Sequence, residues 1–400
     1  METDRVYNIY PEKKKIVIVT SCEEDWGGSE ELWGKSVSYF IDASYSVTVY
    51  KKLINFGHPE FITLAKLGVN FVELKPPVIK KTYATRLRDK LLKLVRRNKN
   101  ILDLSNSLAI FTKNITKEQP NLVLVSQGIN FDGLSYASIC LNLNIPYVII
   151  SQKAVDFYWP PKDARKNMTY AFKNALHCFF VSKHNLTLTS EQFGITFNNA
   201  SIIHNPNKVK AIVPYPCATS IIRLACIGRL FILDKGQDIL LRIMSKKKWR
   251  ERNIIITFIG NGIDEEGLKD MAKLHNLKNV EFIGHVNDIT TVYKRYHALI
   301  QPSRSEGMPL AIVEAMAAGR LVIATRAGGN AELVMDEITG YTGHANEDDF
   351  DEAMERAWNN FHNWEKMGLA AADYISKNTP ICPEADFAKE LLYLINKRLQ

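Results

Sequence analysis

Residues 298–325 read ALIQPSRSEGMPLAIVEAMAAGRLVIAT. The first and last few residues of this stretch are short apolar runs of the kind that form buried strands. Between them, Pro309 is suited to the first turn of a helix, apolar residues follow at helical spacing, and Gly319 marks the helix end. A strand, a helix and a second strand in so short a stretch predict one βαβ unit of a parallel sheet.

The same alternation of strand-like and helix-like segments continues along the chain. Further strand-like runs, most of them separated by helical patterns, lie at 14–20, 122–126, 147–151, 178–182, 221–228 and 253–260. Such alternation is typical of parallel sheets with helices on both faces. The predicted fold class is α/β, with doubly wound parallel sheets of Rossmann type.

The length of 400 residues exceeds what one hydrophobic core usually serves, and it predicts two domains. The best boundary is 203–220, where three prolines and several polar residues separate two strand signals. We expect a Rossmann-like domain over 1–205, a second over 206–382, and a cleft between them. Residues 383–400 are predicted to form one last helix, which could pack back on the first domain.

Composition excludes several classes of protein. With 46% hydrophobic and 24% charged residues, the chain is predicted to be globular, neither disordered nor fibrous. No window approaches the roughly 18 apolar residues of a membrane span. The start lacks the apolar region of a signal peptide, so a cytoplasmic protein is expected. The six cysteines are scattered, which predicts neither a zinc site nor a disulfide framework.

The formal net charge of +8 is unevenly distributed. Residues 1–205 contain 26 Lys+Arg and 18 Asp+Glu, whereas residues 206–400 contain 25 of each. The basic half predicts a face that meets something anionic, such as a membrane surface, a nucleic acid or a phosphorylated acceptor. Within it, 80–99 is predicted to be a basic amphipathic helix. It could attach to anionic lipid, or it could cover the first sheet as a solvated helix.

Two glutamates bracket the start of the helix in the opening stretch. Glu306 precedes the helix and Glu314 lies inside it. The free backbone N–H groups of Gly307, Met308 and Leu310 should point out of the helix start, where they can bond hydroxyl or phosphate oxygens. The alternative is that Glu306 only complements the helix dipole and Glu314 is a solvated surface charge.

The phrase around these glutamates, E-G-M-P-L followed by E-A-M-A-A-G, resembles the signature of the retaining glycosyltransferase family 4. That family has the GT-B architecture, in which two Rossmann-like domains face each other and the C-terminal one holds most of the activated sugar. The resemblance implies that Glu306 lies beside the donor sugar and that the following amides hold its hydroxyls or the diphosphate. It also implies that Glu314 accepts hydrogen bonds from the ribose hydroxyls, as a carboxylate can do with a vicinal diol.

Two cations follow the strand at 221–228. Arg229 comes directly after it and Lys235 precedes a predicted helix. They resemble the arginine and lysine with which the family binds the diphosphate. Physically, cations placed at a departing diphosphate stabilise the charge that develops in the transition state. The alternative for each is a solvated surface group.

The first strand leads into Gly27 and Gly28, and Ser29 could cap a helix that begins at Glu30. This position resembles the family's glycine loop, which is presented to the phosphates and acceptor, so Gly28 is a candidate donor contact. A plain tight connection is the alternative.

Loops at other strand ends supply the remaining candidates. Gly260 and Gly262 follow one strand of the second domain, and His285 and Val286 follow the next. In the family this neighbourhood packs against the nucleobase. In the first domain, many relatives have a histidine near the sugar where this chain has Ser151 and Gln152, so these two are candidate sugar or acceptor contacts.

The predicted function is transfer of a hexosyl group, with retention, from a nucleotide-sugar to an acceptor hydroxyl. Whether the donor is UDP- or GDP-linked stays open; the expected acceptor is a lipid-linked saccharide, and an anionic membrane surface is a second expected partner. A synthase with a soluble acceptor and a non-enzymatic nucleic-acid-binding protein are the alternatives. No cofactor and no metal are expected, because the only D-x-D triplet, at 349–351, is typical of a helix N-terminus.

Overall fold

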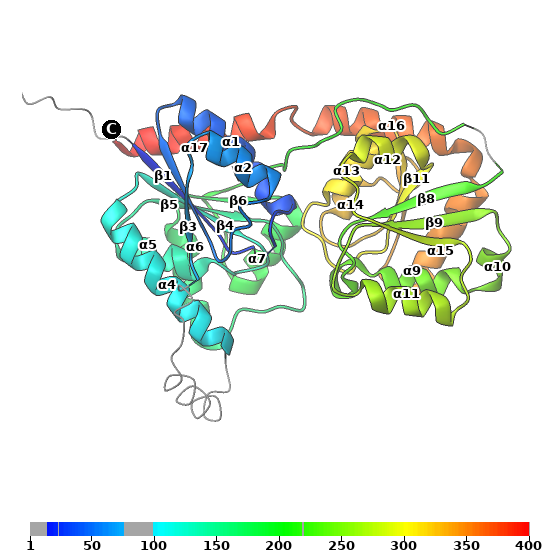
Figure 1. Cartoon of the computed structure of the whole chain (residues 1–400), viewed down its shortest axis with the longest axis horizontal. Helices are drawn as coiled ribbons and strands as arrows, with labels where there is room; N and C mark the ends of the chain where they lie inside the picture. The colour runs from blue at the N-terminus through cyan, green and yellow to red at the C-terminus, as the bar shows by residue number, and fades with distance from the viewer. Residues whose placement is uncertain (1–13, 23, 76–98, 218–219, 400) are drawn as a thin grey trace, which may run out of the picture.

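The computed structural model describes residues 14–22, 24–75, 99–217 and 220–399. They form two α/β domains, each built on one parallel sheet (Figure 1). The predicted doubly wound α/β fold class is therefore confirmed. The predicted amphipathic helix at 80–99 lies outside the described residues except for Lys99.

The first domain contains a seven-stranded sheet in the order β3-β2-β1-β4-β5-β6-β7. Its strands are β1 (Lys15–Thr20), β2 (Ser46–Lys51), β3 (Asn70–Glu73), β4 (Leu122–Gln127), β5 (Tyr147–Ser151), β6 (His177–Phe180) and β7 (Ala200–Ile202). Alternate residues of β1 enter different cores, Ile16 and Ile18 on one face and Val17 and Val19 on the other. A strand buried on both faces explains why its sequence is a continuous apolar run rather than an alternating one.

Helices cover both faces of this sheet. They are α1 (Gly28–Asp42), α2 (Pro59–Lys66), α4 (Lys99–Glu118), α5 (Leu134–Asn142), α6 (Lys162–Asn174) and α7 (Lys183–Phe193). The ring of Phe111 on α4 packs edge to face against Tyr50 on β2. Trp33 and Val37 on α1 lie in the core on the opposite face.

The second domain contains a six-stranded sheet in the order β10-β9-β8-β11-β12-β13. Its strands are β8 (Ile222–Ile227), β9 (Ile254–Ile259), β10 (Val280–Gly284), β11 (Ala298–Gln301), β12 (Leu321–Thr325) and β13 (Gly340–Gly343). Its helices are α8 (Ile232–Lys235), α9 (Gln237–Met244), α10 (Lys247–Arg250), α11 (Glu265–Leu274), α12 (Ile289–Arg295), α13 (Leu310–Ala317), α14 (Asn330–Leu333), α15 (Glu347–Asn359) and α16 (Trp364–Asn378).

The last helix, α17 (Pro383–Leu399), leaves the second domain and packs against α1 of the first, where Figure 1 shows the two helices side by side. Its residues Phe387, Leu391 and Ile395 are buried in the core of the first domain. The described chain therefore passes between the domains twice, in the segment that begins at 203 and again before α17. In the first of these passages, Val209 and Val213 pack into the core of the second domain around α13.

Candidate active site

Each sheet has one point where the strand order reverses, between β1 and β4 in the first domain and between β8 and β11 in the second. In open α/β sheets, ligands bind outside the carboxyl ends of the strands at this point. Five of the loops that carry the predicted site residues leave the sheets there or one strand away, after β1, β5, β8, β9 and β11. Gly307 of the second domain lies against Gln152 of the first, so the two edges face each other.

Glu306 is buried and forms an ion pair with the half-buried Lys235. The lysine ammonium lies 2.6 Å from Glu306 Oε1, and Ser303 Oγ donates to the same oxygen at 2.7 Å. Lys235 is the last residue of α8, and Glu306 follows β11, so the loops after two neighbouring strands meet here. The pair holds a cation and a carboxylate with little exposure to solvent, in a setting where electrostatic effects are stronger than in water.

The loop that leads into α13 presents unused donors. Within the described residues, no acceptor lies at hydrogen-bonding distance from the backbone N–H groups of Gly307, Met308 and Leu310. The backbone of the loop is fixed by a hydrogen bond of 2.9 Å, which the N–H of Gly329 donates to the carbonyl of Gly307. One detail of the sequence prediction was wrong: α13 begins at Leu310, so Pro309 is its N-cap rather than part of its first turn. Three free amides beside a helix start suit an anion.

Glu314 lies on α13 and is buried rather than solvated. The pKa of its carboxyl is raised from 4.5 to about 7, mainly by burial; the nearby Lys208 lowers this pKa and the nearby Glu31 raises it. Lys208, from the segment that joins the domains, forms an ion pair with Glu31 on α1 at 2.8 Å. Two carboxyls from different domains thus flank one lysine.

Arg229 follows β8 and extends toward the first domain. Its guanidinium forms an ion pair with Glu24, in the loop between β1 and α1, and lies 3.5 Å from Asp234. It also lies over the ring of Phe231, 5.5 Å from the centroid. The side chain is 47% exposed, so it remains accessible to solvent.

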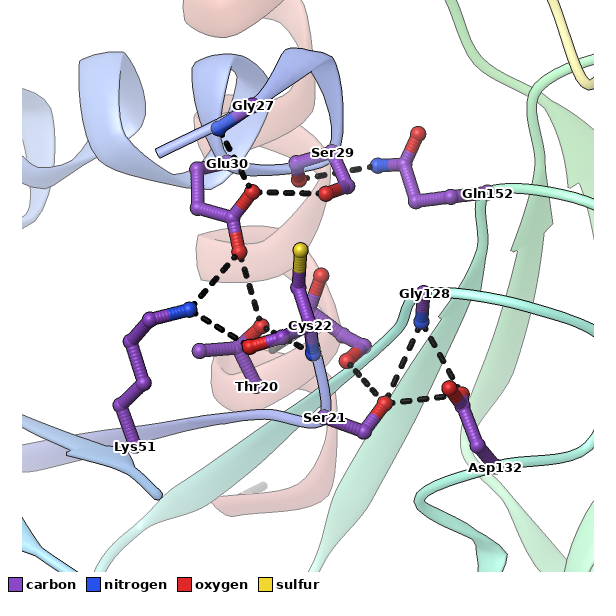
Figure 2. Close-up of polar contacts among 11 residues, drawn as sticks. Thr20, Ser21, Cys22, Gly27, Ser29, Glu30, Lys51, Gly128, Asp132 and Gln152 are labelled. Atoms are coloured by element: carbon purple, nitrogen blue, oxygen red, sulfur yellow. Dashed lines mark hydrogen bonds and ion pairs between the residues drawn. The ribbon is translucent and has the colours of Figure 1, made fainter. Parts of the chain in front are cut away.

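The glycine loop between β1 and α1 is fixed from beneath by a polar cluster (Figure 2). Glu30 is fully buried, and its carboxylate accepts hydrogen bonds from the N–H of Gly27 at 3.2 Å and from Ser29 Oγ at 2.6 Å. The predicted helix start was wrong here, because α1 begins at Gly28 and the Glu30 carboxylate, not Ser29, satisfies the first amide. This exchange leaves Ser29 facing the cluster rather than capping the helix.

Lys51, the last residue of β2, holds both ends of this loop. Its ammonium donates to the carbonyl of Cys22 at 2.6 Å and lies 3.5 Å from Glu30 Oε1 (Figure 2). Above the cluster, Gly28 lies against α13 of the other domain, where an added Cβ would approach Leu310 Cδ1 to 3.2 Å. The glycine loop and the start of α13 therefore meet across the domain boundary.

The other candidates of the second domain differ in what they contact. A Cβ at Gly260 would clash with the carbonyl of Gly228, and one at Gly262 with that of Leu230. Both glycines are thus required where two loops pack backbone to backbone. His285 is exposed, whereas Val286 packs partly against the core beside β8 and β9.

Ser151 is the last residue of β5 and Gln152 follows it at the domain boundary, and both are buried. The amide of Gln152 is engaged on both sides: its nitrogen donates to the carbonyl of Ser29 at 3.2 Å, and its oxygen accepts from Asn205 at 3.0 Å. Ser151 Oγ has no hydrogen-bond partner among the described residues. Of the two, Ser151 therefore retains the freer polar atom.

Sequence reasoning missed several charged residues of this region. Lys51 and Glu30 lie beneath the glycine loop, Glu24 pairs with Arg229, and Lys153 pairs with Asp234. The only sequence signal for any of them was position, since Lys153 directly follows Ser151 and Gln152. Pairing between groups so far apart in the chain carries no local pattern.

Two other features are absent from the described residues. They contain no group of three or more His, Cys, Asp or Glu side chains arranged to hold a metal ion. The triplet at 349–351 lies in the first turns of α15, where Asp351 is bound to Lys246, Lys248 and Trp249. Within the same residues, no helix combines the length and apolar character needed to cross a membrane.

Residues 222–373 match the family described as glycosyl transferases group 1. Protein CapJ of Staphylococcus aureus is 29% identical over 243 residues, which cover 56% of this chain and 60% of CapJ. An uncharacterized glycosyltransferase of Haemophilus influenzae is 33% identical over 161 residues, 39% of this chain and 43% of that protein. The chain thus spans less than two thirds of the length of these relatives.

Solved structures resemble the whole chain. Alr3699/HepE of Anabaena, in complex with UDP, superposes with a TM-score of 0.70 at 15% identity, over 95% of this chain and 99% of that one. Sucrose-phosphate synthase from Thermosynechococcus elongatus gives a TM-score of 0.72 at 14% identity, over 96% and 100% of the two chains. The chain therefore has the two-domain GT-B fold, and its second domain matches the glycosyl transferases group 1.

Proposed function

We propose that the protein is a retaining glycosyltransferase of family 4 that moves a hexosyl group from a nucleotide-sugar to an acceptor hydroxyl. One observation carries the proposal: the Lys235–Glu306 pair lies beside three unbonded amides at the start of α13, at the switch point of the second sheet. The match of residues 222–373 to the glycosyl transferases group 1 supports it.

In this proposal the second domain binds the donor. The amides of Gly307, Met308 and Leu310 donate to the diphosphate or the sugar hydroxyls, and Arg229 and Lys235 neutralise the charge that accumulates on the leaving diphosphate. Glu306 lies beside the sugar, and Glu314 accepts hydrogen bonds from the ribose diol. The departing phosphate oxygen takes the proton of the acceptor, so no side chain becomes a covalent nucleophile.

The donor is proposed to be a UDP-sugar. The Anabaena protein with this fold is described in complex with UDP, with UDP and glucose, and with UDP-glucose. Arg229 and Lys235 can neutralise the diphosphate without a metal, so we propose metal-independent transfer. Activity is expected to persist in excess chelator, and loss of activity that magnesium restores would contradict this part.

The acceptor is proposed to be a lipid-linked saccharide, met at the cytoplasmic face of a membrane. Relatives and structural neighbours include a lipopolysaccharide outer core galactosyltransferase and a phosphatidylinositol N-acetylglucosaminyltransferase subunit. A soluble acceptor is the second candidate, because the sucrose-phosphate synthase shares the fold. Transfer to a soluble sugar in the absence of lipid would favour that second candidate.

A panel of nucleotide-sugars tests the proposal. Purified protein is incubated with UDP-, GDP- and ADP-linked hexoses, while NMR records ligand contacts, slow hydrolysis and the anomeric configuration of the released sugar. We expect one nucleotide to bind and the released sugar to keep the configuration of the donor. Binding of a nucleotide-sugar without any hydrolysis or transfer would contradict the assignment as an enzyme. A released sugar of inverted anomeric configuration would contradict retention.

A further inference from the structure

Among the described residues, three cation–carboxylate pairs lie around α8, where the two domains face each other. They are Arg229 with Glu24, Lys235 with Glu306, and Lys153 with Asp234. The first and third pairs join the domains, whereas the second lies within the second domain. Each of these cations therefore has an anionic partner within the protein.

Lys153 is the cation that the first domain contributes. It lies two residues beyond the end of β5, and its carbonyl accepts the N–H of Asn130 at 2.5 Å, which holds its backbone. Its ammonium lies 2.8 Å from Asp234 Oδ1, and its side chain is only 13% exposed. A lysine so poorly solvated requires an anion beside it, because an unpaired buried charge is costly.

Asp234 connects Lys153 to the proposed donor site. Its second oxygen lies 3.5 Å from Arg229, so one carboxylate contacts a cation from each domain. Asp234 also directly precedes Lys235 in α8, and Lys153 interacts electrostatically with both Lys235 and Glu306. Lys153 thus belongs to the same charge cluster as the two cations proposed to bind the diphosphate.

We propose that Lys153 is a third cation that binds the donor diphosphate, and that the Asp234 carboxylate is the anionic partner of Lys153 until the nucleotide binds. The inference rests on the proposed function and adds to it a residue from the opposite domain. A diphosphate brings more than one negative charge to this cluster, so it can replace the carboxylate as the anion that Lys153 requires. Binding would then depend on both domains being together, because the cations come from both.

The rival explanation is that the Lys153–Asp234 pair only ties the domains together. The two explanations predict opposite effects of Asp234→Asn. If the pair is only a tie, removing either partner loosens the domains, and both variants bind nucleotide more weakly. If Lys153 binds the diphosphate, Asp234→Asn removes a competing anion and leaves affinity equal or higher, whereas Lys153→Met lowers it.

The experiment is calorimetric titration of the full chain with UDP, GDP and the corresponding nucleosides. Lys153→Met is compared with Asp234→Asn and with Lys162→Met, a control on an exposed lysine at the start of α6. A charge-assisted hydrogen bond lost from a diphosphate should weaken binding about ten- to a hundredfold. Nucleoside binding should not change, because it lacks the phosphates.

The outcomes distinguish failure of the proposed function from failure of the inference about Lys153. If the wild type binds neither nucleoside diphosphate, the proposed function fails and the inference fails with it. If the wild type binds but Lys153→Met binds equally well, or Asp234→Asn weakens binding by the same factor, only the inference is overturned. Lys153→Gln is the second variant should Lys153→Met unfold, and thermal unfolding of each variant establishes which ones are folded.

Discussion

At the scale of single residues, the site is built from buried charges that already have partners. Glu306 is held by Lys235 and Ser303, and Glu314 lies beside Lys208. Such arrangements fix the position of each side chain before a ligand arrives, which is the condition for electrostatic stabilisation of a transition state.

Replacing Lys235 with alanine tests this most directly. We expect Lys235→Ala to lower turnover about a hundredfold or more, because a preorganised charge at the leaving group is lost. Steady-state rates with the identified nucleotide-sugar give the measurement. The matched control is Lys269→Ala, since that lysine is exposed on α11 and forms an ion pair with Glu265 four residues earlier. If Lys235→Ala and Lys269→Ala had equal turnover rates, the assignment of Lys235 to the active site would be wrong.

The raised pKa of Glu314 predicts that the free energy of unfolding depends on pH. Its pKa is about 7 in the folded protein and near 4.5 when exposed, so the folded state keeps a proton that the unfolded chain releases. This group therefore lowers the free energy of unfolding progressively as the pH rises from about 4.5 to 7. Denaturant titrations across that range should show a shallower decline for Glu314→Gln. Identical pH profiles for the two proteins would contradict the assigned pKa.

At the scale of elements, the glycine loop depends on the end of a different strand. Lys51 on β2 bonds Cys22 before the loop and lies beside Glu30 after it (Figure 2). Neither Gly27 nor Gly28 has a side chain to hold itself in place. The position of the loop against α13 is consequently set by the buried pair beneath it.

We expect Lys51→Met to cost about 3–5 kcal/mol of stability, because Glu30 becomes an unpaired buried charge. The double variant Glu30→Gln/Lys51→Met should recover part of this loss, since both charges are then absent. Equilibrium unfolding measures both effects. Lys66→Met, at an exposed position in the last turn of α2, is the control and should change little. A double variant less stable than Lys51→Met would show that the unpaired charge of Glu30 does not cause the loss of stability.

At the scale of the whole molecule, the two domains share structure in both directions. The carboxylate of Glu332 in the second domain accepts the N–H groups of Lys183 and His184 at the start of α7 in the first, at 3.0 and 2.7 Å. The last helix, α17, completes the core of the first domain although it follows the second in sequence. The relative position of the domains is therefore tied at several separate points.

Deleting the core contact of α17 should affect the first domain. We expect Phe387→Ala to cost about 3–5 kcal/mol, because that ring is fully buried against Phe179. Tyr393→Ala on the same helix is the control, since its side chain is 62% exposed. Hydrogen exchange resolves where the loss falls, and protection should decrease in β1 and β6 rather than in β8 and β9. Uniform loss across both domains would contradict this assignment.

The sequence by itself determined the fold class, because strands buried on both faces must be continuous apolar runs, as at β1, β4, β5 and β9. It did not reveal the internal strand β2, in which apolar and polar residues alternate, or the edge strands β3, β7 and β13, which are short or mixed in composition. The start of α13 was also predicted to within one residue, since Glu306, Pro309 and Glu314 lie within one short sequence motif.

Only the tertiary structure decided which charges meet. Lys51 reaches Glu30, and Lys153 reaches Asp234, because sheet order and domain contact bring together segments that are distant in the chain. Hydrophobic periodicity reports what a segment buries, and it contains no information about which partner lies opposite. A buried charge depends on that partner for its stability, so the electrostatics of this site are a property of the assembled fold.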